Sequence, residues 1–286
     1  MMHKLLIIIS LSFLALSAEG QFFNKHKPAD NQKQEKPELP EGYENRRDEQ
    51  GRRQGKWMKF HPNGNPAYKA TFKDGKPVDT LVRYYPDGDK YVEIVFEDMG
   101  LLGKGKFYSE EGDLLAEGWY LDMEKDSVWR FYDKKGHLTS KEIYENDQRN
   151  GRAHIYFDDG TKAAVVNYKN GRKDGLEQRF YPDGSRRLHI NYQNGEIHGP
   201  YTVFYTNGLK EIEGRYNHDR RDSTWVFYDA QGNVNYKMEY EEGRPVNKEE
   251  LDSIQRAKFE RFERNRNRLK DPENYRNNPE EYIRGF

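Results

Sequence analysis

Hydrophobic and polar side chains alternate over short stretches of the chain, and these stretches end in turn sequences. Leu188, Ile190 and Tyr192 are separated from one another by single polar residues. A period of two residues is typical of a β-strand with one buried face. Asn194-Gly195 follows this stretch and Asn170-Gly171 follows the one before it, and Asn-Gly is a strong signal for a tight hairpin turn. The pattern therefore predicts successive β-hairpins.

A glycine recurs in the chain every 24 residues without a slip: Gly64, Gly88, Gly112, Gly136, Gly160, Gly184, Gly208 and Gly232. Four residues before each glycine stands an aromatic residue: Phe60, Tyr84, Tyr108, Tyr132, Tyr156, Phe180, Phe204 and Tyr228. Eight residues after it stands another: Phe72, Phe96, Tyr120, Tyr144, Tyr168, Tyr192, Tyr216 and Tyr240. A fixed period of this length indicates a repeat protein in which each unit packs on its neighbours.

The turn residues of each 24-residue unit predict that the unit forms one β-hairpin. Pro182-Asp183-Gly184 is typical of a three-residue turn with a bulge, because proline fixes φ and the glycine accepts the left-handed conformation. We therefore predict an all-β fold, an elongated antiparallel sheet of eight stacked 24-residue β-hairpin repeats over 55–246. Around it we expect a signal peptide (1–20), a flexible leader (21–54) and a helical cap or tail (247–286).

These columns resemble the MORN repeat, and more closely the bacterial MORN repeat variant family. The best matches run from Gly175 to Gly184 and from Gly151 to Gly160, each continued by a Tyr-x-Asn-Gly turn. The resemblance implies a scaffold that binds proteins or lipids, and some relatives are labelled antitoxins of toxin–antitoxin pairs. Two sets of residues depart from the pattern: the opening glycine is replaced by Asp79, Ser127 and Ser223, and the second-turn glycine by Met99, Met123, Asp147 and Asp219.

The N-terminus predicts export from the cytoplasm. Lys4 precedes an apolar run from Leu5 to Ala18, and Ala18-Glu19-Gly20 places a cleavage site before Gln21. The run is shorter than the roughly 20 residues that span a bilayer, so we favour a cleaved signal peptide over an uncleaved anchor. The expected location is the periplasm, the extracellular space or the cell surface.

Composition and charge argue against several classes of partner and binding site. The formal net charge of −1 argues against a nucleic-acid partner, and the absence of cysteine excludes disulfides and thiolate metal sites. No catalytic or nucleotide-binding motif is present, and the eight histidines are scattered. We therefore expect no enzyme activity, no cofactor and no metal site.

A second set of aromatic residues on the first strands is the predicted partner-binding surface. By strand parity we place it on the face opposite the two aromatic columns: Trp57, Phe107, Trp129, Phe131, Tyr181, Tyr201, Tyr205, Trp225 and Phe227. The alternative is that this set simply packs. The leading hypothesis is a secreted scaffold for protein–protein interaction. The alternatives are an antitoxin-like partner of a toxin and a module that binds glycans or lipid surfaces.

The tail has helical spacing and a basic character. Asn247 and Glu250 form a capping-box-like start, and seven basic and two acidic residues lie between Arg256 and Lys270. We favour a cap over the open end of the sheet, which repeat proteins need, over contact with an anionic membrane surface. The oligomeric state stays open.

Overall fold

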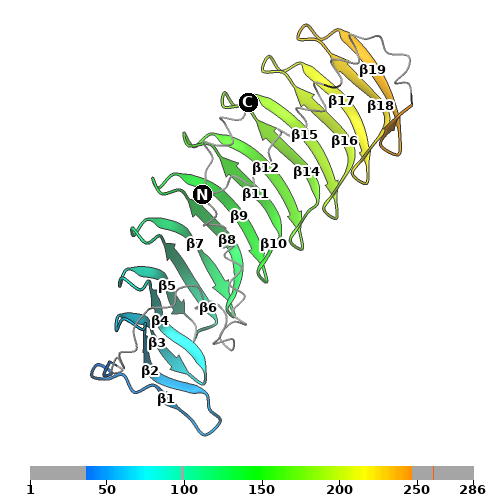
Figure 1. Cartoon of the computed structure of the whole chain (residues 1–286). Helices are drawn as coiled ribbons and strands as arrows, with labels where there is room; N and C mark the ends of the chain where they lie inside the picture. The colour runs from blue at the N-terminus through cyan, green and yellow to red at the C-terminus, as the bar shows by residue number, and fades with distance from the viewer. Residues whose placement is uncertain (1–36, 98–99, 247–259, 261–286) are drawn as a thin grey trace, which may run out of the picture. The chain divides into compact units, whose positions relative to one another are not determined.

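The computed structural model describes residues 37–97, 100–246 and Glu260, and it divides the chain into two compact units. Unit 1 comprises the chain through Gly112 together with Gly118–Asp126, and unit 2 comprises Asp113–Glu117 and the chain from Ser127 onward. The predicted signal peptide and all of the predicted tail except Glu260 lie outside the described residues. The structure contains strands and tight turns in both units (Figure 1).

The strands of the two units follow one another along the chain. Unit 1 contains β1 (Arg46–Arg47), β2 (Arg53–Phe60), β3 (Pro66–Lys73), β4 (Lys76–Tyr84), β5 (Lys90–Glu97) and β6 (Leu102–Tyr108). Two strands, β7 (Leu114–Leu121) and β8 (Glu124–Tyr132), are divided between the units. Unit 2 continues with β9 (Leu138–Glu145), β10 (Gln148–Arg149), β11 (Gly151–Tyr156), β12 (Lys162–Lys169), β13 (Arg172–Lys173), β14 (Gly175–Phe180), β15 (Arg186–Gln193), β16 (Glu196–Phe204), β17 (Lys210–Asn217), β18 (Arg220–Tyr228), β19 (Val234–Glu241) and β20 (Arg244–Pro245).

Neighbouring strands in the chain are neighbours in the sheet, and the pairs in each unit are antiparallel. In unit 1, β2 to β6 pair in chain order. In unit 2, the long strands from β8 to β19 pair in the same way, each hairpin stacking on the next. The prediction of an all-β antiparallel fold built from hairpin repeats is confirmed.

The first turn of each repeat has the predicted geometry. Gly184 has φ of 81°, and its N–H donates to the carbonyl of Tyr181 at 2.9 Å. The register slips by one residue between Arg179 and Phe180, which is the bulge expected beside such a turn. All eight turn glycines have positive φ, so the 24-residue glycine column marks a backbone requirement.

The second turn keeps its geometry even where glycine is missing. Asn170 and Gly171 have φ of 49° and 78°, as a type I′ turn requires. Asp122-Met123 repeats this conformation, with φ of 46° and 74°, without glycine. Asn146-Asp147 and His218-Asp219 also have two successive positive φ angles, so at the described departures the turn is kept without glycine; Met99 lies outside the described residues.

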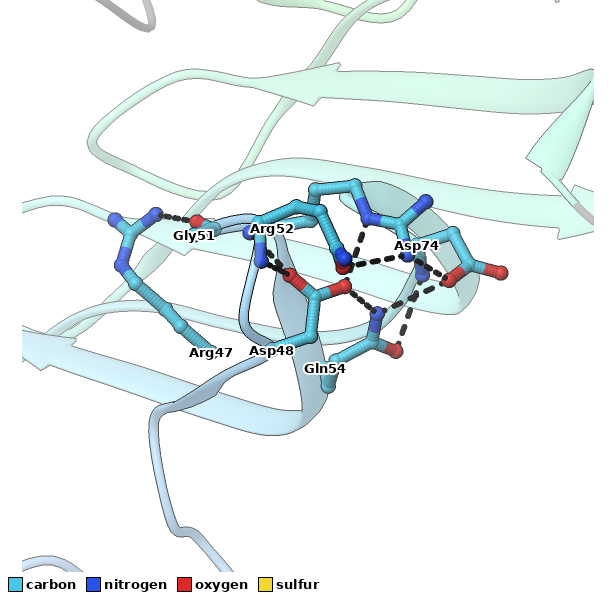
Figure 2. A network of polar contacts seen from close by, with 7 residues as sticks. Arg47, Asp48, Gly51, Arg52, Gln54 and Asp74 are labelled. Carbon is cyan, nitrogen blue, oxygen red and sulfur yellow. Dashed lines mark hydrogen bonds and ion pairs between the residues drawn. The ribbon is translucent and has the colours of Figure 1, made fainter.

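Part of the predicted flexible leader is structured, which corrects its boundary. Arg46 and Arg47 form β1 and pair with Gln54 and Arg53 of β2. Figure 2 shows the polar network at this hairpin, in which Asp48 accepts hydrogen bonds from the backbone N–H of Arg52 and from the Gln54 amide, at 2.8 and 2.9 Å. Arg52 also reaches Asp74 of the first repeat at 3.1 Å, so residues 46–54 form an extra half-repeat on the N-terminal side.

Candidate binding surface

The two faces of the sheet are defined by the strand pairs of the last repeat. Trp225 is opposite Met238, and Phe227 is opposite Tyr236; we call their side the inner face. Val226 is opposite Lys237, and we call that side the outer face. The same repeat positions define the two faces in the other repeats, because the hairpin register is the same.

The predicted partner-binding residues lie mainly on the inner face and are buried. Trp129 and Trp225 are 0% exposed, and Phe107 is 2% exposed. Trp57, Tyr201 and Phe227 are each 5% exposed, and Phe131 is half-buried. The prediction that this set forms an accessible face opposite the aromatic columns is therefore wrong, and these side chains pack.

The physical reason is the register across the first turn. Antiparallel pairing joins Trp57 to Ala70 and Trp225 to Met238, so odd positions of one strand share a face with even positions of the next. The tryptophans therefore join the second aromatic column, which includes Phe72 and Tyr240. The first column lies on the outer face, where the hydroxyl of Tyr228 donates to Glu213 at 3.1 Å. A one-residue parity error moves a whole set of side chains to the other face.

Trp225 is the centre of an aromatic cluster in the last two repeats. Its ring centroid lies 5.1 Å from that of Tyr216, 5.3 Å from Tyr201 and 6.0 Å from Tyr240. Its indole N–H donates to the carbonyl of Arg215 at 3.2 Å. A Cβ added to Gly214 would lie 2.3 Å from the Trp225 ring, so the glycine makes room for the indole. Burial raises the pKa of Tyr201 above its ordinary range, consistent with a dry cluster.

Tyr181 and Tyr205 have a structural role at the first turns. Tyr181 Oη donates to the carbonyl of Phe204 at 2.8 Å, and Tyr205 Oη donates to the carbonyl of Tyr228 at 2.8 Å. Each bond joins a turn to the next repeat, 23 residues later. These tyrosines therefore connect adjacent repeats, which the sequence analysis did not predict.

Two buried carboxylates were also not singled out from the sequence. Glu177 is 1% exposed and is held by Arg179 Nε at 2.6 Å and Lys173 Nζ at 3.1 Å. Glu142 is equally buried and is held by Arg149 Nε at 3.0 Å, and it accepts a hydrogen bond from Tyr144. Each carboxylate is satisfied by cations on the same face. The signal in the sequence was a glutamate at each of two repeat positions that the other repeats fill with apolar, aromatic or small residues.

Tyr144 on the inner face acts as a hydrogen-bond donor inside the packed interior. Burial, together with the neighbouring Glu142 carboxylate, raises the pKa of Tyr144 to about 12, so its hydroxyl stays protonated and donates. Among the described residues, no cluster of histidine, aspartate and glutamate side chains suits a metal ion. In the same part of the chain, no helix is long and apolar enough to span a membrane.

The comparisons with known proteins support the repeat. The family model described as "MORN repeat variant" matches residues 53–74 and 173–194. The chain carries MORN repeat variants. The two matches fall in different structural units, at equivalent positions of repeats 1 and 6, so MORN variants occur in both. No curated protein matches the chain.

A likeness to solved structures is weaker. A structure titled "Crystal Structure of TcdB2-TccC3-TEV" is 12% identical over 65% of this chain, with a TM-score of 0.19. The chain spans 14% of that protein's length. The MORN variants themselves, which are common in protein- and membrane-binding modules, fit a repeat scaffold.

Proposed function

We propose that the MORN variants form an exported, non-catalytic scaffold that binds a protein partner through the outer face of the sheet. The observation that carries this proposal is the burial of the inner face. Trp129 and Trp225 are completely buried, whereas outer-face residues such as Arg152 and Lys237 are exposed. A regular, solvent-facing sheet surface of this kind is a suitable platform for recognition.

The experiment is site-specific photocrosslinking in cells. A photoreactive residue replaces Arg152, Arg215 or Lys237 on the outer face, and Asn207 or Gln231 in exposed turns serves as the control. We expect one protein to be captured from the outer-face positions and not from the turns. Capture from the turns alone would contradict the outer-face proposal.

Export is part of the proposal and rests on the apolar run from Leu5 to Ala18. N-terminal sequencing of the protein from an extracytoplasmic fraction should begin at Gln21. A soluble cytoplasmic protein that begins at Met1 would contradict export.

The glycan-binding alternative depended on the second set of aromatic residues on the first strands. Most of these residues are buried, so they do not support that alternative. The antitoxin alternative requires a cytoplasmic target and therefore competes with export. Fractionation decides between these two locations.

A further inference from the structure

Two cationic side chains and a histidine stand directly opposite one another on the outer face of repeats 4 and 5. Arg130 of β8 is paired with Lys141 of β9, and Lys141 is paired in turn with His154 of β11. We call these three residues the cationic row. Directly opposed side chains in antiparallel strands have Cβ atoms about 5 Å apart, so the row spans roughly 10 Å.

Further groups extend the cationic row into a patch. Arg152 lies two residues before His154 on β11 and therefore shares its face, about 7 Å along the strand. Lys162 is paired with Tyr156, whose ring stacks on the His154 ring with a centroid separation of 6.4 Å. The patch is thus two-dimensional, with an aromatic ring at its border.

In the described part of the chain, the cations of this patch are not neutralised by ion pairs. Within the described ranges, Arg130, Lys141, Arg152 and Lys162 form no ion pair with a carboxylate. Glu145 at the end of β9 is the one carboxylate among the described outer-face positions of β8, β9, β11 and β12 from Val128 to Asn167, and it accepts a hydrogen bond from the Asn150 amide. Glu117 of β7 occupies the repeat position of Glu213, next to Arg130 at the end of the row, and it accepts a hydrogen bond from the Tyr132 hydroxyl at 2.9 Å.

The outer face of repeats 7 and 8 is balanced instead. There Glu213 forms an ion pair with Lys210 at 2.6 Å and accepts a hydrogen bond from Tyr228. The equivalent row across the strands of these repeats consists of Thr202, Glu213, Val226 and Lys237, each paired with the next. No two like charges are adjacent in that row. The cationic row is therefore a local feature and not a property of every repeat.

Like charges directly opposite each other destabilise a sheet. His154 shows the effect on a single group: burial, followed by the charges of Lys162, Arg152 and Lys141, lowers its pKa. Its Nδ1 is also buried without a hydrogen-bond partner among the described residues. An anionic ligand would relieve both the repulsion and the lowered basicity.

We infer that the cationic row, with Arg152 and Lys162, binds an acidic segment of a protein partner. This inference rests on the proposed scaffold function and names the chemistry of its partner. Guanidinium groups match the planar geometry of carboxylates. An extended peptide presents alternate side chains about 7 Å apart on one side, which fits the separation of His154 and Arg152. Two or three carboxylates fill the patch.

The test measures binding of a fluorescent peptide to the full chain. The probe is a decapeptide of alternating glutamate and serine, and its lysine–serine counterpart is the negative control. The test variant carries Arg130→Gln, Lys141→Gln and Arg152→Gln. The matched control carries Arg215→Gln, Arg220→Gln and Lys237→Gln in repeats 7 and 8, with the same change in charge.

We expect the acidic peptide to bind and the test variant to weaken binding by about tenfold or more, with little effect in the matched control. Binding should weaken with salt and strengthen as the pH falls from 7.5 to 6, because His154 takes up a proton beside the carboxylates. Lys141→Gln alone should leave the melting temperature unchanged or slightly higher. A merely structural lysine would lower it.

Other outcomes would overturn the inference. Equal loss of binding in both triple variants would mean nonspecific attraction, and binding to anionic phospholipid vesicles without binding to the peptide would indicate a lipid surface. If the peptide fails while photocrosslinking still captures a partner from the outer face, the scaffold proposal stands and the acidic-segment inference falls.

Discussion

Repeats 6 and 8 fill the same inner-face position in opposite ways. Repeat 8 places Trp225 there, packed among tyrosines and over Gly214. Repeat 6 places Glu177 there, held by Arg179 and Lys173. Both side chains are at most 1% exposed. The repeated hairpin therefore fixes the backbone and the face, while either aromatic packing or charge pairing completes the interior.

The aromatic interior of repeat 8 and the charged interior of repeat 6 should respond differently to substitution. An aromatic side chain that is removed leaves a cavity, whereas a charge that is removed leaves its partner buried without compensation. The stability lost with an aromatic side chain increases with the volume of the cavity. The stability lost with a charge depends on which charged partner remains buried. The substitutions below separate these mechanisms.

The largest effect should come from Trp225→Ala. We expect the free energy of unfolding to fall by about 3–5 kcal/mol, as for other large-to-small changes in a packed interior. Denaturant unfolding followed by circular dichroism measures it, and Val226→Ala on the outer face is the control, with a loss of about 1 kcal/mol or less. A silent Trp225→Ala would contradict the inner-face assignment.

The next effect should come from Glu177→Gln. Arg179 and Lys173 then lose the carboxylate that compensates them, and we expect a loss of about 3 kcal/mol, measured in the same way. The triple variant Lys173→Ile, Glu177→Tyr and Arg179→Val copies Ile197, Tyr201 and Val203 of repeat 7. It should recover most of the stability, since apolar replacement of a whole buried charged group is often neutral. Failure of this rescue would show that the two interiors are not interchangeable.

Gly214→Ala should cost about 1–3 kcal/mol because the added methyl group overlaps the Trp225 ring. Thermal melting gives the loss directly. Combining it with Trp225→Leu should produce less than the sum of the two single losses. Simple additivity would mean that Gly214 and Trp225 do not compete for the same space.

Tyr205→Phe should cost about 1 kcal/mol, because it removes one hydrogen bond between adjacent repeats and leaves the ring in place. Hydrogen exchange of the amides near Tyr228 should increase more than exchange in β12. Unchanged protection at Tyr228 would argue against a role for this bond in joining the repeats.

The smallest effect concerns pH and the outer face of repeats 5 and 6. Burial, followed by nearby cations, lowers the pKa of His154 and of His189. The unfolded chain therefore binds protons more readily, and the free energy of unfolding should fall as the pH drops through about 6.5 and below. Melting of His154→Gln between pH 7.5 and 5.5 should show a shallower fall than the unmodified chain. A steeper fall would mean that the protonated imidazole stabilises the fold.

The sequence by itself determined the repeat, the two turn types and the burial of the second aromatic column. These features are local: alternation sets the strand, and glycine or Asn-Gly at a fixed spacing sets the turn. Tyr168, Leu188 and Ile190 are buried as the alternation predicts.

Only the tertiary structure decided which face each first strand presents. That choice depends on the register across a bulged turn, where one residue moves Trp225 from solvent to the interior. The same register brings Arg130, Lys141 and His154 together from three strands, and it places Arg179 beside Glu177. The sequence shows which residues are charged or aromatic. Which of these residues contact one another depends on strand pairing, because contacts across a sheet are set by register and not by proximity along the chain.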